Sequence, residues 1–202
     1  MSLTAWLTIV GICALGALSP GPSLAVVLKH TLAGGRSKGM TAAITHGLGV
    51  GLYALVCISG LAVVIVTSTT LFAILQWSGA AYLLWMGVKG LLSRSNPNQD
   101  LPDVEAHAAA RDGFMIVFLN PKIAVFFIAL FSQVVGTDTS ILGKVVYAST
   151  AMFIDGLWYV IVAWLFSNPL WLATLQARAV WLDRIFGVLL IGLASKLAID
   201  MA

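Results

Sequence analysis

Charged residues are scarce in this chain of 202 residues. Asp, Glu, Lys and Arg make up 9% of it and hydrophobic residues 60%, with a mean hydropathy of +0.99. A soluble domain carries about 25% charged residues. With 11 basic and 8 acidic residues the chain cannot cover a water-facing surface, so a soluble globular protein is excluded. The same composition excludes intrinsic disorder.

Other absences narrow the class further. Two cysteines are too few for a disulfide scaffold. No basic residue precedes Lys29, whereas a secretory signal peptide begins with basic residues, so secretion is not expected. The chain has no nucleotide-binding G-x-x-x-x-G-K-[ST] motif and no H-E-x-x-H motif. We therefore expect neither an ATP-driven pump nor an enzyme, with no cofactor and no metal site.

Long uncharged stretches predict membrane-spanning helices, each of which needs about 20 apolar residues. The stretches are 1–28, 39–88, 123–137, 145–154 and 156–177, and a polar dip at Thr67–Thr70 divides the longest. Membrane strands are disfavoured because they alternate apolar and polar residues. We predict an all-α integral membrane protein with six helices, at roughly 3–28, 40–66, 71–92, 113–134, 142–166 and 181–199.

The predicted helices divide into two groups of three around one polar loop. We expect residues 1–92 to form the first three-helix repeat, 93–112 a polar cytoplasmic loop, and 113–202 the second repeat. Because each half crosses the membrane three times, the second repeat is inverted in the membrane relative to the first. Residues 170–178 are expected to form a short interfacial helix. Placing both termini outside leaves eight basic residues inside and two outside, which satisfies the positive-inside rule. That rule also explains the pI near 9.0, so no nucleic-acid partner is expected.

Two proline motifs break the predicted helices at 3–28 and 113–134. Proline lacks the backbone donor that a helix interior needs, and Asn before Pro suits the start of a new half-helix. Such starts present backbone N–H groups and a positive dipole end, which together attract anions. We expect a substrate carboxylate to be bound by Pro20, Gly21, Pro22, Ser23, Asn120, Pro121 and Lys122.

Depth estimates bring further polar residues to the same level. Pro20 and Pro121 each lie nine residues from a charged residue at the inner face, or about 13 Å deep in a core of about 30 Å. His46 comes out at about 12 Å from the inner face and Asp155 at about 16 Å from the outer face. Polar groups near the midplane at two broken helices are typical of secondary transporters. Asp155 is the expected proton carrier, with His46 as a second candidate for proton coupling.

Each feature also has a structural interpretation. The prolines kink membrane helices in many proteins, and Lys122 could extend toward the interface. A buried ion pair between Lys122 and Asp155 is a further alternative, with the substrate competing for Lys122. Asp155 and His46 could serve only as hydrogen-bonded structural groups. The glycines at 47, 49 and 51 predict close helix packing, with Gly49 expected to face the broken first helix.

The motifs resemble those of the lysine exporter and homoserine/threonine exporter (LysE/RhtB) family of bacterial amino-acid exporters. The matching segments run through most of the chain and are Ser19-Pro20-Gly21-Pro22, Gly35-Arg36 with Gly39, the Gly79–Gly87 stretch, Gly113-Phe114, Asn120-Pro121-Lys122 and Phe126–Phe131. Two positions depart from the family pattern: Ser23 stands where Asn is frequent, and Ser132 where Pro is frequent. The resemblance therefore names no particular amino acid.

The resemblance implies a multi-pass protein of the bacterial inner membrane that exports amino acids or related small solutes, driven by the proton motive force. Its expected partners are the substrate, protons and the lipid bilayer, and the charge-poor surface is compatible with a homodimer. Two other functions stay open. Cys13 and Cys57 could form a transmembrane thiol–disulfide carrier, although counting along the helices places both near the outer side, away from the proline breaks. A soft-metal exporter would have to use His46 with Cys57, which lie about 16 Å apart along one helix.

Overall fold

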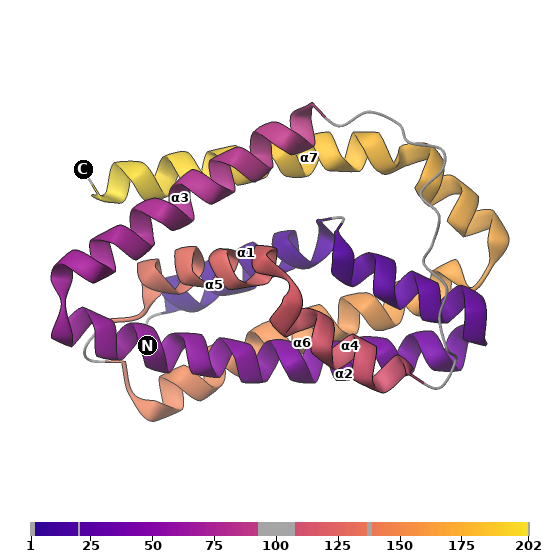
Figure 1. Cartoon of the computed structure of the whole chain (residues 1–202), viewed down its shortest axis with the longest axis horizontal. Helices are drawn as coiled ribbons and strands as arrows, with labels where there is room; N and C mark the ends of the chain where they lie inside the picture. The colour runs from indigo at the N-terminus through magenta and orange to yellow at the C-terminus, as the bar shows by residue number, and fades with distance from the viewer. Residues whose placement is uncertain (1–2, 20, 93–107, 137–138, 202) are drawn as a thin grey trace.

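The computed structural model describes residues 3–19, 21–92, 108–136 and 139–201, and every regular element in these ranges is an α-helix. Figure 1 shows their arrangement. The helices are α1 (Leu3–Leu18), α2 (Pro22–Thr67), α3 (Thr69–Leu91), α4 (Ala109–Leu119), α5 (Pro121–Val134), α6 (Ile141–Phe166) and α7 (Pro169–Met201). The predicted all-α class is confirmed. Most of the polar loop predicted at 93–112 lies outside the described residues.

Capping side chains set several of the helix boundaries. At the end of α2, the Ser68 backbone N–H donates to the Val64 carbonyl at 2.9 Å. At the start of α3, the Ser68 hydroxyl accepts a hydrogen bond from the Leu71 N–H at 3.1 Å. The Ser140 hydroxyl opens α6 in the same way. The predicted division of residues 39–88 at the polar dip is therefore confirmed, because Ser68 supplies the cap that each end needs.

The first two predicted helices have different boundaries in the structure. Residues 3–28 do not form one helix, because α1 ends at Leu18 and a new helix begins at Pro22. That helix runs through the expected inner connection and is interrupted only at Gly35, whose φ of 75° is accessible to glycine at little cost. The predicted connection between the first two spans is thus a kink at one residue.

The last helix is longer than predicted. Residues 170–178 are not a separate interfacial helix but the first turns of α7, which continues without a break to Met201. The Asn168 side chain accepts from the Leu170 N–H at 3.0 Å and caps the start, and Pro169 occupies the first helical position. No break occurs between residues 178 and 181, where the two predicted helices were separate.

The seven helices pack as three groups that run roughly parallel in Figure 1. Helices α3 and α7 lie side by side, α2 packs along α6 and α4, and α1 and α5 lie between these groups. The larger apolar core joins α1, α2, α5 and α6, with Leu83 and Leu190 contributed by α3 and α7. A smaller core fills the space between the two parts of α2 and helices α4 and α6.

Glycines allow the closest of these contacts. A Cβ at Gly47 would lie 2.8 Å from the Gly156 Cα of α6, and one at Gly51 would meet Met152. Close packing at these glycines is confirmed. The expectation for Gly49 is wrong: this residue lies on the opposite face of α2 and meets Phe114 and Val117 of α4 instead of α1.

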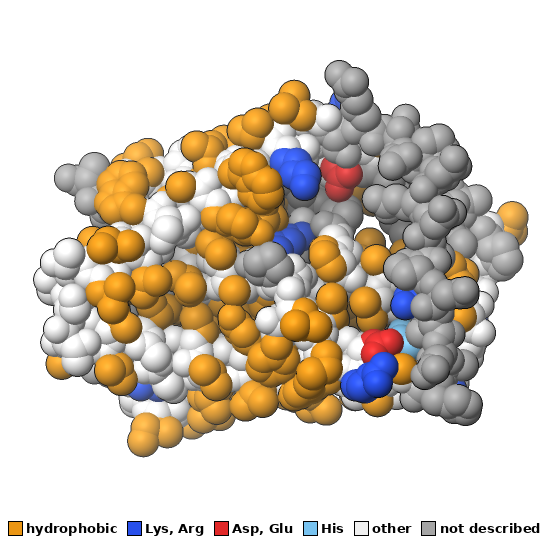
Figure 2. All heavy atoms as spheres, viewed as in Figure 1, with side chains coloured by type: hydrophobic (Ala, Val, Ile, Leu, Met, Phe, Trp, Pro, Cys, Tyr) orange, Lys and Arg blue, Asp and Glu red, His pale blue; other side chains and the backbone are white. Residues whose placement is uncertain are grey.

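The outer surface is apolar, as a lipid-facing surface requires. Figure 2 shows hydrophobic side chains spread over much of one face, with few charged groups in view, most of them between the middle and the right of the picture. Val56, Val66, Phe153 and Leu157 are each more than 60% exposed. By length and composition three described helices could span a membrane, and the bent pair α4–α5 would make a fourth. The arrangement of six spans in two inverted repeats stays a prediction.

Candidate functional site

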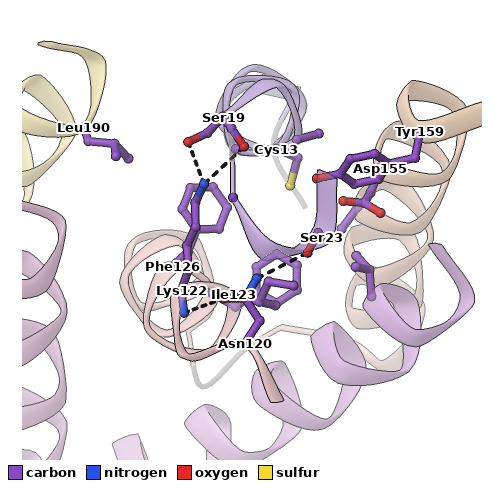
Figure 3. A pocket seen from close by; sticks show the side chains of 16 residues that line it. Cys13, Ser19, Ser23, Asn120, Lys122, Ile123, Phe126, Asp155, Tyr159 and Leu190 are labelled. Atoms are coloured by element: carbon purple, nitrogen blue, oxygen red, sulfur yellow. Dashed lines mark hydrogen bonds between the residues drawn. The ribbon is translucent and has the colours of Figure 1, made fainter. Parts of the chain in front are cut away.

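Both proline breaks open onto one pocket between α1, the start of α2, and helices α5, α6 and α7. Its polar lining comprises Ser19, Gly21, Ser23, Asn120, Lys122, Asp155 and Tyr159. The larger apolar residues that line it are Cys13, Val50, Ile123, Phe126, Phe127 and Leu190. Figure 3 shows these side chains converging from the surrounding helices. Segments a hundred residues apart in sequence thus build one site.

The second break has the predicted cap. The Asn120 side-chain oxygen accepts from the Lys122 N–H at 3.1 Å, and Pro121 begins α5 behind it. Helices α4 and α5 bend by 58° at this point. The first break has Gly21 at the cap position and Pro22 at the first helical position of α2. Two helix N-termini, each with a partial positive charge, therefore lie at the pocket.

The two breaks are tied to each other across the pocket. The Asn120 Nδ2 donates to Ser23 Oγ at 3.2 Å, and both side chains are buried. The Lys122 ammonium donates to the Ser19 hydroxyl at 2.6 Å and to the Ser19 carbonyl at 3.2 Å. That carbonyl belongs to the segment where the first helix ends, so Lys122 neutralises a backbone group that the break has exposed.

Lys122 stays in the pocket and does not extend toward the interface. A Cβ on Gly21 would lie 3.3 Å from its ammonium nitrogen, so glycine leaves room for the side chain there. The Asp183 carboxylate of α7 acts on the ammonium electrostatically. The alternative in which Lys122 pairs with Asp155 is not what the structure shows, because Asp155 has another partner.

That partner is His46. The Asp155 Oδ2 lies 2.6 Å from His46 Nδ1, and His46 is completely buried while Asp155 is 15% exposed and lines the pocket. The His46 Nε2 atom has no hydrogen-bond partner among the described residues. The two expected proton-coupling residues therefore form one pair, with the carboxylate at the pocket and the imidazole behind it.

The remaining predicted site residues are placed less directly. Pro20 lies outside the described residues. Pro22 and Pro121 begin α2 and α5, and Pro22 is not among the described residues that line the pocket. Their contribution in the structure is to end one helix and start the next, which sets the position of the cap residues.

The prediction that Cys13 lies away from the proline breaks is wrong. Counting from Lys29 placed it near the outer side and away from the breaks, yet it is buried and lines the pocket. The count assumed a continuous helical rise, whereas α1 and α2 are separate helices. Cys13 and Cys57 are both free thiols. Among the residues that the structure describes, no group of three or more His, Cys, Asp or Glu side chains could hold a metal ion.

The sequence analysis missed three aromatic residues of the pocket. Phe126 and Phe127 belong to the segment that carried the family resemblance, and Phe126 packs where Gly16 leaves space. Tyr159 is fully buried one helical turn after Asp155. Its spacing of four residues from Asp155 was the available signal, because residues four apart share one helix face.

Comparisons with known proteins agree with this architecture. A threonine efflux protein of Escherichia coli (strain K12) is 26% identical over 204 residues, covering 98% of this chain and 99% of its own length. A leucine efflux protein of Klebsiella pneumoniae is 28% identical and covers 90% and 88%. An uncharacterized membrane protein of Bacillus subtilis, YrhP, is 25% identical and covers 94% and 96%. No solved structure matches the chain.

The bacterial relatives and the apolar helices together support the predicted multi-pass protein of the bacterial inner membrane. The family model for the LysE type translocator matches residues 14–201, which include both proline breaks, Lys122, His46 and Asp155. The resemblance seen in the motifs is confirmed, and the chain belongs to the LysE type translocator family.

Proposed function

We propose that the protein exports amino acids across the inner membrane by alternating access, with outward substrate movement coupled to inward proton movement. The observation that carries this proposal is the pocket, where a cationic site at two broken helices lies opposite a buried His–Asp pair. An amino acid needs both kinds of site, because it carries a carboxylate and an ammonium group.

The substrate carboxylate binds on the side of Lys122 and Asn120. Lys122 now holds the Ser19 hydroxyl and carbonyl, which a carboxylate oxygen can replace as acceptor with a stronger, charge-assisted bond. The starts of α2 and α5 add backbone N–H groups and positive dipole ends. Binding there loosens the contact between Lys122 and Ser19, and so loosens the tie between the two breaks.

The substrate ammonium and the proton share Asp155. An ammonium group and a proton both neutralise a carboxylate, so they compete for Asp155 when one pocket serves both. His46 holds the other side of this carboxylate, with 2.6 Å between its Nδ1 atom and the Asp155 Oδ2 atom. Mutually exclusive occupancy by substrate and proton is the condition for exchanging one against the other.

The lining indicates a neutral substrate side chain. Phe126, Phe127, Val50 and Leu190 provide apolar surface, and Asp155 is the carboxylate that lines the pocket. The names of two relatives, threonine and leucine efflux proteins, point to the same class. We infer small or aliphatic neutral amino acids as substrates.

Proteoliposomes preloaded with a mixture of labelled amino acids test the proposal. With a pH gradient imposed, the wild-type protein should release one or a few neutral amino acids, and both Asp155→Asn and Lys122→Met should abolish gradient-driven release. Lys144→Met, which removes a lysine from the start of α6 outside the pocket, is the matched control and should transport normally. If the wild type releases no amino acid under either direction of the gradient, the proposed substrate class is wrong.

A further inference from the structure

The Phe126 ring forms the part of the pocket wall next to the site proposed for the substrate carboxylate. Phe126 follows Lys122 by one helical turn, so both side chains project from the same face of α5. Both point toward the end of α1 (Figure 3), where the Lys122 ammonium donates to Ser19 Oγ and the ring lies against Gly16. The ring is 7% exposed and lines the pocket. An amino acid held at Lys122 therefore lies beside this ring.

The substrate side chain has to occupy the apolar part of the pocket. In the proposed binding mode the carboxylate lies at Lys122 and the ammonium group at Asp155, and the side chain is attached to the carbon between them. The wall beyond these two polar groups is mainly apolar, with Gly16 and Phe126 on the side of Lys122. The Phe126 ring therefore limits how far a substrate side chain extends on that side.

Glycine at position 16 sets where the ring lies. A Cβ there would lie 2.6 Å from the Cζ atom of Phe126 and 2.9 Å from its Cε1 atom. Nonbonded carbon atoms prefer separations of about 3.5–4.0 Å, so an added methyl group would displace the tip of the ring by about 1 Å. The glycine thus lets the ring lie back against α1, which leaves room in the pocket.

The pocket is the side toward which the ring can move. Its neighbour along α5 is the Phe127 ring, whose centroid is 5.9 Å away. Phe127 is itself buried and packs against the rings of Phe131 and Tyr53, and side chains in such close packing do not yield easily. A methyl group at position 16 would therefore push the Phe126 ring into the space that a substrate side chain occupies.

We propose that Phe126, positioned by Gly16, limits the length of the substrate side chain that the pocket accepts. Phe126 is the specificity-determining residue that contacts the substrate, and Gly16 is a positioning residue that acts through the ring. Leucine extends one bond farther from its Cα than valine or threonine, so a displaced ring affects leucine most. The inference rests on the proposed export of neutral amino acids but not on proton coupling.

Exchange in proteoliposomes at equal pH on both sides tests this role, with labelled L-leucine, L-valine and L-threonine as probes. Valine has nearly the size and shape of threonine but no hydroxyl, so the ratio of leucine to valine exchange reports side-chain length apart from polarity. For Gly16→Ala we expect this ratio to fall about tenfold, as one methylene group does in a tight apolar pocket. Gly11→Ala, in the same helix with nothing within 4 Å of the added Cβ, should leave the ratio unchanged.

A smaller side chain at position 126 should compensate for the methyl group at position 16. Phe126→Leu removes the tip of the ring, and we expect it to raise the ratio of leucine to valine exchange about threefold. In the double variant Gly16→Ala with Phe126→Leu, the ratio should return to within about twofold of wild type, because residues in contact act non-additively. A purely structural defect at Gly16 would not be relieved by a second substitution in the core.

Equal losses for leucine and valine in Gly16→Ala, or an unchanged ratio, would overturn the inference. If Gly16→Ala does not fold, Phe126→Leu alone decides, and an unchanged ratio in that variant would refute a role for Phe126 in selection. A wild type that exchanges none of the three amino acids would refute the proposed export itself. That result is distinct from an active wild type whose selectivity does not respond to changes at residues 16 and 126.

Discussion

Asn120 performs two tasks with one side chain. Its oxygen caps α5 by accepting from the Lys122 N–H, and its nitrogen donates to Ser23 across the pocket. An aspartate could cap the helix but could not donate to Ser23, and a serine could not reach both partners. The amide thus serves as acceptor at the cap and as donor across the pocket.

Replacing Asn120 by Ala should weaken transport more than stability. The lost cap costs about 1 kcal/mol of unfolding free energy, and the lost bond to Ser23 separates the two breaks. Ser140→Ala is the matched control because it removes the cap of α6 outside the pocket at a similar cost. Equal transport by the two variants at equal stability, measured by efflux and thermal unfolding in detergent, would contradict a functional role for Asn120.

The free thiols provide a second prediction at this scale. Cys13→Ala combined with Cys57→Ala should leave gradient-driven amino-acid release within about threefold of wild type, because neither thiol carries charge or protons in the proposed cycle. Release is measured with and without a thiol reductant. Loss of all activity in the double variant, or a need for the reductant, would favour the thiol–disulfide carrier instead.

The residue types at the site could be predicted from the sequence, but their partners could not. Proline after Asn and glycine between prolines indicate helix breaks through local backbone chemistry. A carboxyl in the middle of a span, such as Asp155, indicates function because placing an ionisable group inside the membrane costs free energy. The pairing of Asp155 with His46 instead of Lys122 depends on how α2 and α6 rotate against each other. Helical spacing along one chain contains no information about that rotation.

At the scale of helices, α2 and α6 lie close together beside the His46–Asp155 pair. Gly47 directly follows His46, and its missing side chain lets Gly156, which directly follows Asp155, come near. The same two glycines that bring the helices together therefore bring the His46 and Asp155 side chains to 2.6 Å.

Gly47→Ala should accordingly destabilise the protein and weaken the His–Asp pair. The added Cβ would lie 2.8 Å from the Gly156 backbone, and overpacking of this kind costs about 1–3 kcal/mol. Gly60→Ala in the same helix meets nothing within 4 Å and should be neutral or slightly stabilising, because Ala favours helix by about 1 kcal/mol over Gly. Thermal unfolding of both variants measures the contrast, and a Gly47→Ala protein as stable as Gly60→Ala would contradict the packing described.

Helix ends with a polar cap could be predicted, whereas the length of charged helices could not. Ser68 and Asn120 divide or bend helices where the sequence indicated, since their side chains satisfy backbone groups locally. The start of α7 was misplaced because the uncharged stretch ends at Arg178, while the backbone continues as a helix through it. Hydropathy reports the environment of a helix and not where its hydrogen bonding ends.

For the whole molecule, the distribution of basic residues predicts both chain termini on the outer side of the membrane. A green fluorescent protein fused after Ala202 should stay dark, and alkaline phosphatase fused there should be active in the periplasm. A phosphatase fused within residues 93–112 should be inactive, which serves as the internal control. With the 93–112 loop inside, bright fluorescence from the C-terminal fusion would mean an even number of spans after the loop and would exclude a second three-helix repeat.

The central claim is that one pocket exchanges an amino acid for a proton. The most direct measurement records lumenal pH with a trapped dye while L-threonine or L-leucine leaves proteoliposomes that have no initial pH gradient. The account predicts that wild-type release acidifies the medium inside the vesicles as protons enter, and that Asp155→Asn abolishes the pH change. Amino-acid release by the wild type with no change in lumenal pH would contradict proton exchange at Asp155.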